Sequence, residues 1–149
     1  MKITLITLFT LVTISVVFAP PNLNDPGPNE ELLAAIEYKR ATETEELKKA
    51  TMERLWRATC YVETRNNPKS INRQEMAFGI VQVRKIRLYD YFNETGKRYK
   101  LRDMLDTSKA KEVYMYYAEK NLDPETISRK WNGSGPMTTK YWNKVKKHI

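Results

Sequence analysis

The sequence is poor in the residues that build metal clusters and cross-links, with one cysteine, Cys60, and one histidine, His148, among its 149 residues. A single cysteine excludes a disulfide within the chain. One thiol and one imidazole are also too few for the usual clusters of soft metal ligands. We therefore expect no metal site and no cofactor, and we interpret His148, which follows two lysines, as a surface residue.

Acidic residues are scarce relative to basic ones, since 18 Asp and Glu stand against 26 Lys and Arg and leave a net charge of +8. Residues 61–149 hold 19 basic and 10 acidic side chains, whereas residues 20–60 hold 6 and 8. A cationic domain concentrates near anionic polymers, because the fields of its charges add over the whole surface. Nucleic acid, anionic lipid and the carboxylate-rich cell wall all fit this charge, and so does a role in solubility alone.

Residues 1–19 have the layout of a signal peptide or membrane leader, in which Lys2 is followed by the uncharged run ITLITLFTLVTISVVFA. The stretch 3–18 would span about 24 Å as a helix, less than the roughly 30 Å hydrocarbon core of a bilayer. We therefore expect export to the periplasm or cell envelope, and the small residues Val17-Phe18-Ala19 place the candidate cleavage position after Ala19. Pro20 makes this position a poor protease substrate, and an uncleaved leader would tether the domain to the membrane.

A linker follows the leader, because residues 20–29 contain four prolines and a glycine. Residues 30–50 are rich in helix formers but have few apolar anchors after Ile36, which predicts a mostly solvated helix or pair of helices. We therefore assign residues 20–50 to a linker and solvated helix. Residues 51–149 are long enough for one domain with its own core, and we expect that domain to carry the function.

Glu63 lies on the apolar face of a helix predicted from Thr51 onward. Apolar side chains recur at helical spacing, and Glu63, eleven positions after Met52, points within about 20° of the same direction. An acid there loses hydration, so its pKa should rise toward the range that a general acid needs. Pro68 ends the helix soon afterwards, so Glu63 lies near the negative end of the helix dipole. This dipole also disfavours the charged carboxylate and should raise the pKa of Glu63.

A structural role for Glu63 is equally compatible with the helix alone. A glutamate near a helix end can lie at the margin of the core and pair with Arg57 or Arg65.

Four segments, taken together and in this order, resemble the soluble lytic transglycosylases and goose-type lysozymes. They are Glu63-Thr64 with Asn67-Pro68, AFGIVQV (77–83), RKWNGS (129–134) and YWNKV (141–145). The likeness covers roughly the last hundred residues. It implies a lysozyme-like fold, which we expect to be α-rich (α+β), with a small irregular or β-like segment near 77–83.

The resemblance also implies roles for individual residues. Glu63 matches the catalytic acid/base, and Thr64 stands where the family has serine. Gly79 and Gln82 match a segment whose glutamine lines the sugar cleft. Trp131 and Asn132 match a Tyr-Asn pair that faces the glutamate, although tryptophan donates a hydrogen bond and cannot accept one. Tyr141 matches a tyrosine that helps to shape the cleft, and the Glu63-to-Gln82 stretch is one residue longer than the common pattern.

The remaining segments predict further helices. Residues 106–121 form an amphipathic pattern after a capping aspartate, and Asp123-Pro124 begins another helix. Thr138 or Thr139 begins the last one, whose packed stripe comprises Tyr141, Trp142 and Val145. Residues 84–105 interleave basic and aromatic side chains, which is compatible with nucleic acid but favours a solvated helix and a cleft wall.

The resemblance implies a lytic transglycosylase that breaks the bond between N-acetylmuramic acid and N-acetylglucosamine and leaves 1,6-anhydromuramic ends. With a water in place of the muramyl C6 hydroxyl, the same site is an N-acetylmuramidase. The motifs contain no second carboxylate of the usual glycosidase kind, and Glu75 and Glu94 are the nearest candidates in sequence. Other classes are a non-catalytic cell-wall-binding protein and an exported nucleic-acid binder. We expect peptidoglycan glycan strands as the partner, no nucleic acid, and a monomer.

Overall fold

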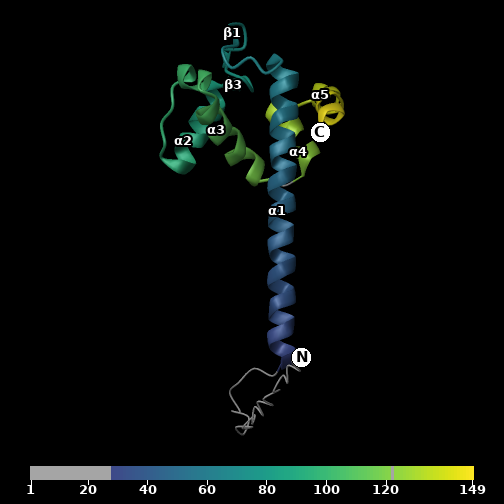
Figure 1. Ribbon diagram of the computed structural model, residues 1–149. Helices are drawn as coiled ribbons and strands as arrows, with labels where there is room; N and C mark the ends of the chain where they lie inside the picture. The colour runs from purple at the N-terminus through teal and green to yellow at the C-terminus, as the bar shows by residue number, and fades with distance from the viewer. Residues whose placement is uncertain (1–27, 122) are drawn as a thin grey trace, which may run out of the picture. The chain divides into compact units, whose positions relative to one another are not determined.

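The computed structural model describes residues 28–121 and 123–149, whose helices and strands are drawn in Figure 1. In chain order the elements are α1 (Pro28–Thr64), β1 (Ile71–Asn72), β2 (Ala77–Phe78), β3 (Val83–Arg84), α2 (Lys85–Thr95), the 3-10 helix η1 (Leu101–Leu105), α3 (Thr107–Glu119), α4 (Pro124–Asn132), α5 (Met137–Val145) and the 3-10 helix η2 (Lys146–His148). The fold is rich in helix with one small antiparallel sheet, so the predicted α-rich α+β class is confirmed.

The chain divides into two compact units, residues 1–38 and 39–149. The described part of the first unit, residues 28–38, is helical and exposes the side chains of Leu32 and Leu33. The predicted domain start near residue 51 falls inside α1, which continues through it without a break. The leader 1–19 and the linker residues 20–27 lie outside the described residues. Among those described, no helix combines the length and apolarity needed to cross a membrane.

The C-terminal end of α1 is defined by backbone geometry. Arg65 and Asn66 have φ values of 55° and 64°, and their N–H groups donate to the carbonyls of Tyr61 and Cys60. A left-handed residue after the last helical turn is a common way to satisfy free carbonyls at a helix end. The predicted helix stop before Pro68 is confirmed, and Glu63 lies in the last turn.

The core of the second unit packs the last turns of α1 against α3 and α4. Trp56 meets the ring of Tyr114 edge-on at 5.3 Å, and Tyr114 in turn meets Trp131 at 4.8 Å. The hydroxyls of Thr59 and Tyr114 lie 3.0 Å apart, which satisfies both polar groups in a buried place. Because Leu55 is also fully buried in this cluster, the end of α1 is held firmly against the other helices.

Side-chain caps begin two of these helices as the sequence predicts. Asp106 accepts from the backbone N–H groups of Ser108 and Lys109 at the start of α3, and Asp123 accepts from Thr126 at the start of α4. The last helix begins at Met137, slightly earlier than the predicted start at Thr138 or Thr139.

The predicted β-like segment near 77–83 consists of β2, a turn and β3, paired in register with Ala77 opposite Arg84. A further strand, β1, pairs with β2 and was not predicted. Gly79 has a φ of 78°, and a Cβ there would lie 1.8 Å from the carbonyl oxygen of Met104. The turn therefore requires glycine, because it packs directly against the backbone of η1.

Candidate active site

Glu63 is half-buried in the last turn of α1, and its Oε1 accepts a 2.7 Å hydrogen bond from the Tyr141 hydroxyl. Burial raises the pKa of Glu63 to about 7, because the charged form loses hydration. The Tyr141 hydrogen bond and the charge of Arg84 act in the opposite direction. The carboxyl therefore holds a proton near neutrality and can release and recover it there, as acid/base catalysis requires.

Tyr141 is itself buried on α5, with 8% of its surface exposed. Burial raises its pKa well above the ordinary value, and the nearby Glu63 charge adds to this effect. The phenol therefore stays protonated and serves Glu63 only as a hydrogen-bond donor.

Thr64 links the end of α1 to the turn between β2 and β3. Its hydroxyl lies 2.8 Å from the carbonyl oxygen of Ile80 and 3.2 Å from that of Cys60. The first contact joins residues that are sixteen positions apart and so fixes the turn beside Glu63. The hydroxyl of Thr64 therefore has a structural role, because it links α1 to the turn.

Gln82 lies at the end of that turn in a left-handed conformation, with a φ of 54°. Its side-chain nitrogen donates to the carbonyl oxygen of Gly79 at 2.9 Å. A non-glycine residue held at positive φ is costly, and such strain gathers at functional sites. The cleft role of Gln82 stays a prediction, whereas Gly79 is required by the close approach of η1.

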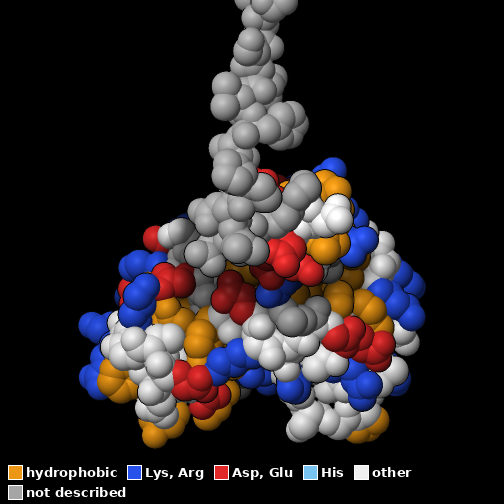
Figure 2. Space-filling model, turned by 90° about the horizontal axis from the view of Figure 1, so that it is seen from below, with side chains coloured by type: hydrophobic (Ala, Val, Ile, Leu, Met, Phe, Trp, Pro, Cys, Tyr) orange, Lys and Arg blue, Asp and Glu red, His pale blue; other side chains and the backbone are white. Residues whose placement is uncertain are grey.

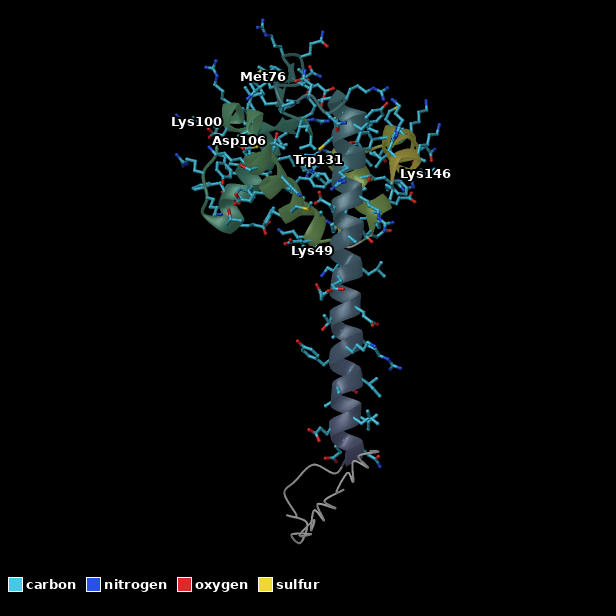
Figure 3. The ribbon with its side chains drawn as sticks, in the orientation of Figure 1. Lys49, Met76, Lys100, Asp106, Trp131 and Lys146 are labelled. Carbon is cyan, nitrogen blue, oxygen red and sulfur yellow. The ribbon has the colours of Figure 1, made fainter. Side chains whose placement is uncertain are left out.

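Trp131, labelled in Figure 3, is buried in the core with 6% of its surface exposed, and its ring meets those of Tyr114 and Tyr117 on α3. Its indole N–H donates to the carbonyl oxygen of Val81 at 2.9 Å, so this donor is engaged by the turn and not by Glu63. Asn132 ends α4, and its carbonyl oxygen accepts a 3.1 Å hydrogen bond from Nη2 of Arg84. Both residues thus tie α4 to the β2–β3 segment.

These hydrogen bonds connect all the predicted site segments. The end of α1 is bonded to the turn through Thr64 and to α5 through Tyr141, while α4 is bonded to the turn through Trp131. The seven residues of the predicted site therefore belong to one connected group of elements. Among the other six, Tyr141 is the one with a direct hydrogen bond to Glu63.

The sequence interpretation included Arg84 in the basic and aromatic stretch 84–105 but gave it no role toward Glu63, whose pKa its charge lowers. Gln82 lies in a turn with a left-handed φ of 54°, so strand alternation does not relate its side chain to that of Arg84. Arg84 is placed by its hydrogen bond to the carbonyl oxygen of Asn132, 48 positions away, and no local sequence signal specifies that contact.

The two candidate second carboxylates differ in their surroundings. Glu75, in the exposed turn between β1 and β2, forms a 3.3 Å ion pair with Arg84, and its charge raises the pKa of Glu63. Glu94, on α2, pairs instead with Lys120 of α3, and this contact lowers its pKa. Of the two, Glu75 is the carboxylate that acts electrostatically on the site.

Comparisons with protein-family models, with curated proteins and with solved structures found no match.

Cys60, one turn before Glu63, does not offer nucleophilic chemistry. Burial raises the pKa of its thiol to about 12, so the thiolate that would attack a substrate is not populated near neutrality. Of the two residues, Glu63 is therefore the one that can release and bind a proton near neutral pH.

The basic surplus does not gather into one patch on the face drawn in Figure 2, where acidic side chains lie between the basic ones. Several lysines are engaged in ion pairs, namely Lys97 with Glu112, Lys111 with Glu53 and Lys120 with Glu94. On this face the charges do not form the continuous basic strip that typically follows a phosphate backbone.

Proposed function

We propose that this protein is an exported lytic transglycosylase that cleaves peptidoglycan between N-acetylmuramic acid and N-acetylglucosamine. The observation that carries the proposal is the half-buried Glu63, with a pKa raised to about 7 and a Tyr141 donor 2.7 Å from Oε1. A merely structural ion pair would give the opposite shift, since a cationic partner lowers the pKa of a carboxyl. The order of the motifs that resemble the family supports the same conclusion.

In the first step, protonated Glu63 donates its proton to the bridging oxygen as the glycosidic bond to muramyl C1 breaks. The muramic acid's own acetamido oxygen stabilises the developing positive charge at C1, so no second carboxylate is needed. The new Glu63 carboxylate keeps the Tyr141 hydrogen bond, and the positive charge of Arg84 favours this ionised state.

In the second step, ionised Glu63 takes the proton of the muramyl C6 hydroxyl as its oxygen bonds to C1. The acetamido group is released, a 1,6-anhydro ring closes and Glu63 is protonated again. No water is consumed. A pKa near 7 suits both steps, because neither protonation state of Glu63 is strongly disfavoured at neutral pH.

The test is digestion of purified peptidoglycan followed by mass spectrometry of the soluble fragments. The wild type should release fragments with anhydro ends, and Glu63→Gln should release none. Glu94→Gln is the matched control, since it removes a carboxyl that pairs with Lys120, and it should keep full activity.

Reducing ends would instead assign the protein as an N-acetylmuramidase. Binding to peptidoglycan without any fragments would contradict an enzymatic role and favour a wall-binding protein. Activity retained in Glu63→Gln would refute the assigned role of this residue.

A further inference from the structure

Arg84, on β3, carries a guanidinium whose positive charge acts on Glu63. Its Nη2 donates to the carbonyl oxygen of Asn132 at 3.1 Å, which anchors the side chain to the end of α4. Asn132 is one of the predicted site residues, so this hydrogen bond places Arg84 of β3 within the candidate site. The electrostatic effect of Arg84 on Glu63 agrees with this position.

The anionic partner of Arg84 is weakly held. The ion pair with Glu75 joins Nη2 to Oε2 at 3.3 Å, and the two side chains are 39% and 57% exposed. Exposed pairs of this kind contribute little net stability and are readily replaced. Among the described residues, Nε and Nη1 of Arg84 form no hydrogen bond, so most of the guanidinium donors face no protein acceptor.

Glu75 is carried by an exposed turn. Residues 73–76 are all exposed, and Met76 in this turn has a φ of 49°. The side chain of Asn72 accepts from the backbone N–H groups of Gln74 and Glu75, which shapes the turn from within. Withdrawal of the Glu75 carboxylate from Arg84 therefore breaks no core contact.

We propose that Arg84 binds a carboxylate of the muramyl substrate and that Glu75 occupies this position while the site is empty. A guanidinium matches a carboxylate with two parallel N–H donors, whereas the single contact to Glu75 leaves this capacity unused. The inference rests on the proposed function and adds a selection for anionic glycans. Neutral glycans would leave Glu75 in place and gain nothing from Arg84.

Two sources can supply this carboxylate. In peptide-free strands the lactyl group of each muramic acid ends in a free carboxylate. In strands that bear peptides, the lactyl carboxyl is amide-bonded and the carboxylates lie on the peptide.

The experiment measures binding in the Glu63→Gln background, so that no ligand is cleaved and the titration of Glu63 plays no part. Three ligands are compared: peptide-free strands, peptide-bearing strands, and peptide-free strands whose lactyl carboxylates have been converted to methylamides. Arg84→Gln should weaken binding of a carboxylate ligand about tenfold or more, which is the size expected for a lost charge-assisted contact. Arg84→Lys should lose less, and Glu75→Gln should bind the carboxylate ligand more tightly by removing the competitor.

The methylamide strands separate recognition from structure. If Arg84→Gln acted only by removing the structural hydrogen bond to Asn132, it would weaken the binding of all three ligands equally. That result would overturn the proposal. An Arg84 effect on the peptide-free strands alone identifies the lactyl carboxylate, and an effect on the peptide-bearing strands alone identifies the peptide.

The outcomes also separate this inference from the proposed function. Cleavage of peptidoglycan by the wild type, with an equal Arg84→Gln effect on every ligand, would refute the inference and keep the enzyme. Carboxylate-dependent binding without cleavage would keep the inference and refute the enzyme. Failure of all three strands to bind, together with no cleavage by the wild type, would refute both.

Discussion

The Tyr141 hydroxyl donates a 2.7 Å hydrogen bond to Oε1 of Glu63 across 78 positions of sequence. A general acid needs a pKa near the working pH and a fixed orientation, and the surroundings of Glu63 bear on both. Burial disfavours the charged form and raises the pKa of Glu63, while the phenol moderates that rise and orients one carboxylate oxygen. The other carboxylate oxygen, Oε2, has no hydrogen-bond partner among the described residues, so Tyr141 positions the acid without occupying both of its oxygens.

Tyr141→Phe should move the pH dependence of cleavage toward higher pH. The lost hydrogen bond favoured ionised Glu63, so its removal raises the Glu63 pKa above about 7. Because proton donation requires the protonated acid, the alkaline limb of kcat/KM follows that pKa upward. Profiles of the wild type, Tyr141→Phe and Tyr89→Phe test this, since Tyr89 is an exposed residue of α2 and its variant should match the wild type. An alkaline limb that stays in place or moves down would contradict the assigned role of Tyr141.

Glu63→Gln should make the fold more stable at pH 8 than the wild type, with a smaller gain at pH 4. The folded-state pKa of about 7 exceeds the ordinary 4.5, so the wild type is relatively stabilised below pH 4.5 and loses that stability as pH rises to about 7. The full shift corresponds to about 3 kcal/mol, and partial exposure of the carboxyl makes about 1–2 kcal/mol the expected size. Urea unfolding at the two pH values measures the difference in the free energy of unfolding between the variant and the wild type. A gain in stability that did not depend on pH would show that ionisation of Glu63 does not destabilise the folded protein.

Local rules predicted the helix that carries Glu63 and the way it ends. Apolar spacing placed Glu63 on the buried face, and Pro68 limited the helix, because both signals act over a few residues. The predicted start near residue 51 reflects where the α1 face begins to pack, as shown by the buried Met52 and Leu55, and not where the helix begins. Residues that favour helix continue upstream to Pro28, where α1 begins. The onset of apolar spacing near residue 51 therefore did not coincide with the start of the helix.

Long-range contacts were out of reach of such rules. The partners of Tyr141 and Arg84 lie on other elements, and nothing in the neighbouring sequence specifies them. The inward position of Trp131 did have a local signal, since Ile127, four residues earlier on α4, is also buried and both lie on one helix face. Similarity to the family motif directed attention to a cleft role for Trp131, whereas helical periodicity indicates the core.

Thr64→Val should destabilise the protein by about 1–2 kcal/mol and weaken substrate binding. The hydroxyl lost in this variant bonds to the carbonyl oxygen of Ile80, which would then lack its side-chain donor in a partly buried place. The turn that holds Gln82 would also lose its link to α1, so KM should rise more than kcat falls. Thr64→Ser keeps the hydroxyl and is the matched control. Equal KM values for the valine and serine variants would show that this link does not order the turn.

Gly79→Ala should be far more destabilising than Gly96→Ala, although both glycines have a similar positive φ, 78° and 71°. The left-handed conformation costs an alanine about 1–2 kcal/mol at either position. At Gly96 the added Cβ meets nothing within 4 Å, whereas at Gly79 it would lie 1.8 Å from the carbonyl oxygen of Met104. That overlap forces η1 away from the turn, and a cost above about 4 kcal/mol places the variant among the rare severe substitutions. Thermal unfolding of the two variants separates backbone strain from the clash, and equal losses would mean that the turn does not pack against η1 as closely as described.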